Sequence, residues 1–177
     1  MIAIRRARLS DAPGIAAVHV ATWRSAYADI LPEEVLTRLS APRLTRYYEH
    51  SLRLGVAMHV AASYGRNEAP GVVGFCSASR ARESGLGDGE IETLYLLDDY
   101  QNRGLGGELL RIAAKHLWQT GCRSLYVWVL SENPSRYFYQ RMRGRCVAEG
   151  VTNVGGENFA QTAFAWDPIE TLLDVNA

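Results

Sequence analysis

The sequence predicts one α+β domain, residues 1–177, built around a mixed β-sheet. Three observations support this fold class. The chain has 177 residues, which is close to the usual length of one domain. Apolar residues make up 47% of it and charged residues 21%, as in ordinary globular proteins. The spacing of the apolar residues changes from helical to strand-like along the chain, with no internal repeat or linker.

The first third of the chain is predicted to be mostly helical. After a short strand at residues 2–6, a helix is expected at residues 10–26, because apolar side chains recur there at helical spacing. Ser10 is suited to cap this helix, and the proline that follows is tolerated in a first helical turn. Two more helices are expected, at residues 32–39 and 42–52.

From residue 57 onward the pattern changes to short strands separated by turns. Strands are predicted at residues 57–63, 71–79, 90–97, 124–130, 145–152 and 159–166. A turn-rich stretch at 65–70 separates the first two strands, and a polar loop at 82–89 precedes the third. An amphipathic helix is expected at 104–119, ended by Gly121, and a shorter helix at 135–142.

The charged residues and the cysteines narrow the classes of partner. Lysine plus arginine number 19, as do aspartate plus glutamate, so the formal net charge is zero. Such a chain lacks the basic surface that displaces counterions from nucleic acid, and no nucleic-acid partner is expected. Cys76, Cys122 and Cys146 are far apart and odd in number, which favours reduced thiols over disulfides or a zinc cluster.

Signals for metal binding, export and membrane insertion are missing from the sequence. The four histidines show no paired metal-ligand spacing, so we expect no metal site. The first eight residues lack the long apolar stretch of a signal peptide. No apolar run approaches the ~20 residues needed to cross a membrane. We therefore expect a cytoplasmic protein with no membrane partner.

The most informative segment runs from Glu90 to Gly107 and combines a strand, a glycine-bearing loop and the start of an amphipathic helix. The first turn of a helix exposes unpaired backbone N–H groups, and glycines let a phosphate approach them. Arg103 would add a full positive charge. The segment therefore predicts an anion site, with a plain strand-to-helix turn as the alternative. Glu108 stands where a P-loop has lysine, and Leu109 where a dinucleotide fingerprint has its third glycine, so neither motif fits.

Several motifs, in order along the chain, resemble those of the GNAT-type N-acetyltransferases. Residues 101–106, Gln-Asn-Arg-Gly-Leu-Gly, resemble the Q/R-x-x-G-x-G/A loop of that family. The strand at 126–130 and the segment 132–139, which ends in Phe-Tyr, resemble the family's next strand and its N-x-x-x-x-F-Y helix. Residues 4–12 and 23–32 resemble the opening strand and the acceptor-side helices of many members.

The resemblance implies a twisted mixed sheet that is splayed between the strands at Glu90 and Ser124, with helices on both faces. Acetyl-coenzyme A (acetyl-CoA) would sit in this splay as co-substrate. Its pyrophosphate would be held by the loop residues Gln101, Asn102, Arg103, Gly104, Leu105, Gly106 and Gly107. The acetyl group would pass directly to an amine, without a covalent enzyme intermediate.

The resemblance also assigns roles beside the thioester. The backbones of Leu94, Tyr95 and Leu96 would pair with the pantetheine arm and the thioester carbonyl, and one N–H would stabilise the oxyanion. Asn133 and Tyr139 would lie across the gap, with Tyr139 as the general acid that protonates the departing thiolate. The alternative for Tyr139 is an aromatic side chain that fills the core. Asn133 precedes the Phe-Tyr pair by one residue fewer than in many members.

A general base is expected among the glutamates of the same strand. The amine of a lysine-like acceptor has an ordinary pKa near ~10.4 and must lose a proton before it attacks. Alternation along the strand puts Glu90 and Glu92 on one face. Glu90 lies eleven positions before Gln101, which matches the catalytic glutamate of some histone-acetylating relatives. The alternative is that both glutamates are solvated, because many relatives use ordered waters and no single base.

The acceptor amine is left open by the sequence. Polyamines, aminoglycosides, amino acids, protein amino termini and lysine side chains all fit, and Trp23, Tyr27 and Tyr47 are either an acceptor pocket or core aromatics. A basic cluster is either a coenzyme or acceptor contact or a solvated face; it comprises Arg136, Arg141, Arg143 and Arg145. The alternative function is a non-catalytic module that senses acyl-CoA. The family resemblance also allows a homodimer.

Overall fold

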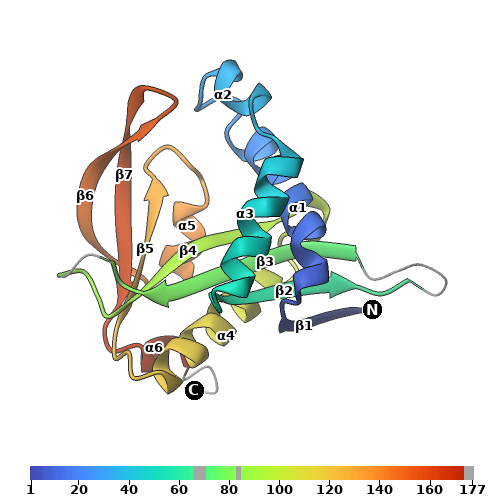
Figure 1. Ribbon diagram of the computed structural model, residues 1–177. Helices are drawn as coiled ribbons and strands as arrows, with labels where there is room; N and C mark the ends of the chain where they lie inside the picture. The colour runs from blue at the N-terminus through green and yellow to red at the C-terminus, as the bar shows by residue number, and fades with distance from the viewer. Residues whose placement is uncertain (66–70, 83–84, 174–177) are drawn as a thin grey trace.

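The computed structural model describes residues 1–65, 71–82 and 85–173, and Figure 1 shows their arrangement. In chain order the elements are β1 (Ile2–Arg6), η1 (Leu9–Asp11), α1 (Ala12–Ala26), α2 (Glu33–Thr37), α3 (Ala41–Arg53), β2 (Ala57–Ser63), β3 (Gly71–Arg80), β4 (Gly89–Leu96), η2 (Asp98–Tyr100), α4 (Leu105–Gln119), β5 (Leu125–Leu130), α5 (Arg136–Arg141), β6 (Arg145–Val154), β7 (Glu157–Trp166) and α6 (Glu170–Leu173).

A seven-stranded mixed sheet forms the centre of the fold, in the order β1-β2-β3-β4-β5-β7-β6. Neighbouring strands pair antiparallel, except β4 and β5, which are parallel. The pairing of β4 with β5 ends at Ile91 and Val127, and beyond this point the two strands diverge (Figure 1). The predicted mixed sheet and its splay between these two strands are confirmed.

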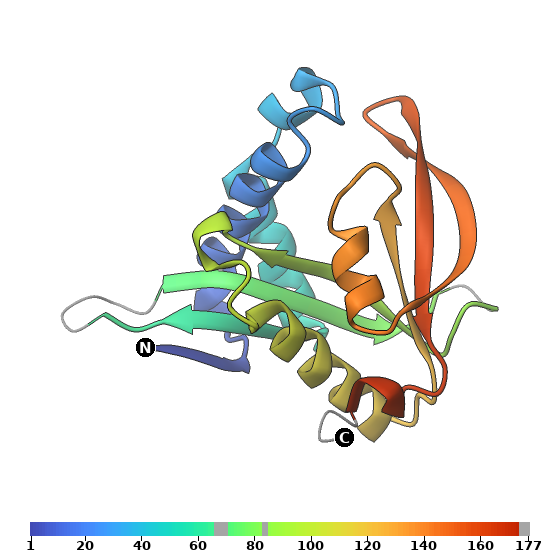
Figure 2. The same cartoon turned by 180° about the vertical axis from the view of Figure 1, so that it is seen from behind.

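Helices cover both faces of the sheet, as predicted. α1 and α3 pack together over one face, in front in Figure 1, where Ile15, Tyr48 and Phe75 belong to one buried cluster. α4 covers the opposite face, in front in Figure 2, and Leu109 belongs to a second cluster there. Successive side chains of β3 alternate between the two, so Phe75 lies in the first cluster and Cys76 in the second.

The element boundaries differ from the prediction mainly in short segments. α2 covers Glu33–Thr37 and not 32–39, because Pro32 has the extended backbone of a residue that precedes a helix. α6, at Glu170–Leu173, was not predicted because four residues are too few for a helical period to be visible. Parts of the predicted turn at 65–70 and of the loop at 82–89 lie outside the described residues.

Candidate active site

A cavity of about 920 Å³ lies where β4 and β5 diverge. We call the part lined from the β4–α4 loop, α4 and α5 its α4 side. Its α1 side is the part lined from α1 and the loop after it, from β6 and β7, and from Glu92 of β4 and Trp128 and Leu130 of β5. Most of the predicted site residues line it: Glu92, Leu94, Tyr95, Leu96, Gln101, Asn102, Gly104, Gly106, Gly107, Asn133 and Tyr139. Glu90, Arg103 and Leu105 are not among its lining residues.

A β-bulge in β4 shapes the cavity. Ala78 of β3 pairs with Ile91, but the neighbouring Ser77 pairs with Thr93, so Glu92 is an extra residue without a partner on β3. A bulge bends its strand and increases its twist. The bulge directly follows Ile91, the last β4 residue that pairs with β5. The residues after it, including Leu94 and Leu96, line the cavity and are not paired with β5.

The loop between β4 and α4 presents a helix N-terminus to the cavity. Asn102 (φ 57°) and Gly104 (φ 83°) have left-handed backbones, which asparagine and glycine tolerate best. The first helical hydrogen bond runs from the Glu108 N–H to the Gly104 carbonyl (3.1 Å). The amides of residues 105–107 therefore have no partner within the helix and carry its partial positive charge. This is the geometry of an anion site.

Three of the predicted loop residues stabilise the loop itself. The Gln101 amide donates to the Leu96 carbonyl (3.1 Å), which fixes the loop to the end of β4. The Arg103 guanidinium is exposed and lies over the Tyr100 ring, 5.4 Å from its centroid. Leu105 is buried, as expected for the first apolar residue of α4.

The two candidate bases occupy different places on β4. The Glu92 carboxylate lines the cavity and accepts hydrogen bonds from the Ser79 hydroxyl (2.6 Å) and the Arg82 guanidinium (2.9 Å). Glu90 pairs with Ser79 across the strands, and its carboxylate accepts from the Tyr126 hydroxyl (3.2 Å). Both glutamates therefore lie on the face covered by α1 and α3, as alternation predicts, but the cavity is lined by Glu92.

Tyr139, on α5, is both a core aromatic and a cavity residue. Its ring stacks on Phe164 (centroids 6.0 Å apart) and meets Phe138 edge-on (5.2 Å). Its side chain is 6% exposed and lines the cavity. Burial raises the pKa of the Tyr139 hydroxyl above its usual range, so the group keeps its proton at neutral pH. A protonated hydroxyl at this position is able to donate to a ligand.

Asn133 connects the two sides of the cavity. Its Oδ1 accepts from the Ser135 N–H (2.9 Å) at the start of α5, and its Nδ2 donates to the Tyr27 hydroxyl (3.3 Å) at the end of α1. Asn133 is buried, and burial also raises the pKa of Tyr27. The side chain thus holds the β5–α5 loop at a fixed distance from α1.

Several lining residues were not predicted from the sequence. Arg111 follows Gly107 by one helical turn, so its place on the α4 side was visible in the helical period. Trp128 alternates with the core residues Val127 and Val129 and therefore faces the α1 side. The remaining unpredicted residues include Thr22, Thr152, Val154 and Gln161. They line the cavity because of how the strands pair and where α1 packs, for which the sequence carried no signal.

The basic cluster and the three aromatics of the early helices divide between cavity and surface. Arg141 lines the cavity, whereas Arg136 donates to the Ser131 carbonyl (3.0 Å) and Arg145 to the Asp167 carbonyl (3.3 Å). Arg143 is exposed. Among the aromatics, Trp23 and Tyr27 line the cavity, and Tyr47 is 54% exposed and does not.

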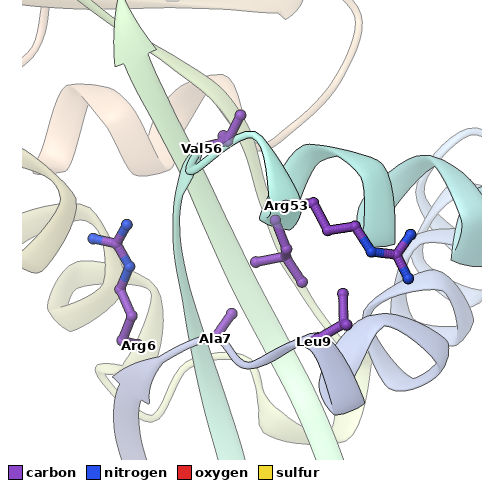
Figure 3. A pocket seen from close by; sticks show the side chains of 6 residues that line it. Arg6, Ala7, Leu9, Arg53 and Val56 are labelled. Atoms are coloured by element: carbon purple, nitrogen blue, oxygen red, sulfur yellow. The ribbon is translucent and has the colours of Figure 1, made fainter.

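A smaller hollow of about 250 Å³ lies between β1 and α3, and its polar lining side chains are two arginines. Arg6 and Arg53 flank it, but Figure 3 shows their guanidinium groups extending in different directions.

Among the described residues, no three or more His, Cys, Asp or Glu side chains gather as metal ligands would. Within the same part of the chain, every helix is too short or too polar to cross a membrane.

The comparison with family models decides the family. Residues 20–144, most of the chain, match the model of the acetyltransferase (GNAT) family. The chain belongs to the GNAT family. It is 33% identical over 173 residues to the uncharacterized N-acetyltransferase YuaI of Bacillus subtilis, covering 97% of this chain and 96% of YuaI. It is 31% identical over 144 residues to the probable N-acetyltransferase Rv2775 of Mycobacterium tuberculosis, covering 79% and 78%.

Solved structures share the fold of this GNAT chain. A GCN5-related N-acetyltransferase of Rhodopseudomonas palustris superposes with a TM-score of 0.69 at 24% identity, over 93% of this chain and 94% of that one. YncA of Salmonella typhimurium, solved with acetyl-CoA, superposes with a TM-score of 0.67 at 18% identity, over 99% and 96%. The predicted family and fold class are thereby confirmed.

Proposed function

We propose that this chain transfers the acetyl group of acetyl-CoA to a primary amine by direct attack. The observation that carries the proposal is the cavity at the splay of β4 and β5, with a free helix N-terminus on its α4 side and the Glu92 carboxylate on the face of α1. One side is suited to a phosphate-bearing donor and the other to an amine. The acetyl-CoA in the YncA structure supports this choice of donor.

The α4 side fits a pyrophosphate. The amides of residues 105–107 point from the helix N-terminus, where an anion is stabilised. A Cβ on Gly106 would lie 3.4 Å from Leu96 and Phe138, so glycine leaves the space that a backbone-bound phosphate requires. The buried Nε of Arg111 has no hydrogen-bond partner among the described residues and is available to a phosphate oxygen.

The chain's own groups supply the chemistry at the thioester. Glu92 accepts a proton from the ammonium of the acceptor, directly or through water, and the neutral nitrogen attacks the thioester carbon. A backbone N–H of Leu94, Tyr95 or Leu96 stabilises the oxyanion. The carbon–sulfur bond then breaks, Tyr139 donates its proton to the departing thiolate, and the second proton of the acylated nitrogen passes through water to restore the phenol. Glu90 is retained as a weaker candidate for the base.

Direct transfer also agrees with the positions of the cysteines. Cys76 and Cys122 are buried, and none of the three cysteines is among the lining residues of the cavity. A thiol nucleophile within reach of the thioester is therefore not available from the described residues.

A non-catalytic acyl-CoA sensor is the second candidate, but it would not need a carboxylate and a phenol in the same cavity. We also expect a single domain and a cytoplasmic location, and the family resemblance allows a homodimer.

A calorimetric titration with acetyl-CoA tests the donor site. Gly107→Glu places a carboxylate in the first turn of α4, where it suits the helix dipole but repels a phosphate. Gly107→Ala is the matched control, because its Cβ would lie 3.4 Å from the flexible end of Arg111. We expect micromolar binding by the wild type and the alanine variant, and at least tenfold weaker binding by the glutamate variant with its melting temperature unchanged. No binding by a folded wild type would contradict the proposal.

A further inference from the structure

The α1 side of the cavity is lined mainly by aromatic and apolar side chains. Trp23 and Tyr27 pack edge to face, with ring centroids 5.1 Å apart, and Trp128 of β5 lines the same cavity. Ala26, Leu31, Leu130 and Val154 add aliphatic surface, and Thr22, Thr152 and Gln161 add neutral polar groups. Among the described residues that line this side, Glu92 is the one that carries a charge, and Arg82 already pairs with it.

An apolar cluster adjoins this side where α2 lies near the β6–β7 hairpin. Tyr27, Leu31 and Leu36 are its buried members, and Val35 of α2 and Val154 of β6 pack against them. Figure 1 shows α2 and the tip of the β6–β7 hairpin approaching each other above the splay. The hairpin backbone at Gly155 is so close to Val35 that a Cβ on the glycine would collide with it. The space for an acceptor therefore has an apolar roof.

One buried hydroxyl on this side lacks a partner. Thr22 is 8% exposed, lines the cavity, and its Oγ1 makes no hydrogen bond with another described residue. A buried hydroxyl without a partner destabilises the folded chain. The group is therefore available to a polar atom of a ligand, such as an amine or a hydroxyl of the acceptor.

We propose that the acceptor is a primary monoamine carried on an apolar, aromatic body, a class exemplified by the arylalkylamines. The inference rests on the proposed function. The rings of Trp23, Tyr27 and Trp128 give an aromatic body stacking surfaces, and ring faces also attract an ammonium group. Glu92 offers one carboxylate to the ammonium group, beside its ion pair with Arg82, and Thr22 offers one hydrogen bond.

The charges exclude other acceptor classes. A polyamine brings several ammonium groups, and the described lining residues of the α1 side offer one carboxylate. A free amino acid brings a carboxylate, for which no described cation lines this side. A buried charge without a counter-charge costs several kcal/mol, which corresponds to about a 100-fold loss of affinity or more. A lysine of a folded protein would have to pass the apolar roof.

The test is an acetylation panel with the full chain and acetyl-CoA, read as kcat/KM from the mass of the acetylated product. The amines are 2-phenylethylamine, tyramine, tryptamine, spermidine, a lysine-containing peptide and phenylalanine, which differs from 2-phenylethylamine by its carboxylate. We expect kcat/KM for each of the three arylalkylamines to exceed that for spermidine, the peptide and phenylalanine by about 100-fold or more. Equal or better use of spermidine, phenylalanine or the peptide would overturn this inference and leave the proposed function intact.

Thr22 variants give a second readout. Thr22→Val removes the unpaired hydroxyl at nearly constant shape, and Thr22→Ser keeps it. We expect the valine variant to raise KM for tyramine several-fold with unchanged affinity for acetyl-CoA and equal or higher thermal stability, and the serine variant to stay close to wild type. An unaltered KM in the valine variant would contradict a role in acceptor binding. Acetylation of no amine, by a chain that binds acetyl-CoA, would overturn the proposed function itself.

Discussion

Glu92 and Glu90 are two residues apart on β4, and they differ in their position relative to the cavity. Glu92 lines the cavity, whereas Glu90 bonds to Tyr126 and does not line it. We expect Glu92→Gln to lower kcat/KM for the amine by about 100-fold, in the range typical of a lost general base. Glu90→Gln should change it less than about threefold. The pH dependence of kcat/KM checks the assignment, and a larger effect at Glu90 would reverse it.

Tyr139 is predicted to act through its hydroxyl and to pack through its ring. Tyr139→Phe keeps the stacking on Phe164 and removes the proton donor. We expect kcat to fall by about 100-fold while the affinity for acetyl-CoA and the melting temperature stay close to wild type. Pre-steady-state release of coenzyme A measures the step directly. An unchanged kcat would restrict Tyr139 to the core.

At the residue scale, the sequence located the cavity residues of the β4–α4 loop better than those of the α1 side. Gly104, Gly106 and Gly107 were predicted because a glycine-bearing loop that leads into an amphipathic helix is typical of an anion site. Thr22 was not predicted, since its place on a helix does not tell whether its neighbours would bond to its hydroxyl. Which of the two glutamates lines the cavity depends on a bulge, and the sequence of β4 carries no signal for it.

The β6–β7 hairpin and α2 form the roof of the α1 side, and their contact depends on a glycine. Gly155 has φ 62°, and a Cβ there would collide with Val35. We expect Gly155→Ala to lower the free energy of unfolding by about 1–3 kcal/mol, from backbone strain and overpacking. Val35→Ala in the same chain should restore part of the loss, since it removes the collision but not the strain. A double-mutant cycle from urea unfolding measures both; additive effects would show that the two elements do not touch.

At the element scale, the helices and strands with clear periods were predicted correctly, including α4 and the seven strands. The pairing of β5 with β7, and not with β6, was not predicted, because the sequence shows strands and turns but not which edges meet. That pairing places Gln161 opposite Leu130 and so brings the hairpin into the cavity wall.

The whole molecule should lose stability as the pH falls from neutral. Burial lowers the pKa of His19 and of His59 from an ordinary 6.5 to about 4. Between these values the unfolded chain binds more protons than the native one, so unfolding becomes easier at lower pH. We expect each histidine to contribute a loss of about 1–2 kcal/mol between pH 7 and pH 5. Urea unfolding at pH 7 and pH 5 measures this loss in free energy of unfolding. The loss should be smaller in His59→Gln than in the wild type, and an equal loss in both would contradict the burial of His59.

The central claim about the molecule is that its cavity joins an acetyl donor to an amine. The most direct measurement follows release of the coenzyme A thiol and the mass of the amine together, with acetyl-CoA, tyramine and the wild-type chain. We predict one free thiol for each amine that gains one acetyl group, with both products formed about 100-fold more slowly by the Tyr139→Phe and Glu92→Gln variants. Tight binding of acetyl-CoA with neither thiol release nor acetylation of any amine would contradict the account and favour an acyl-CoA sensor.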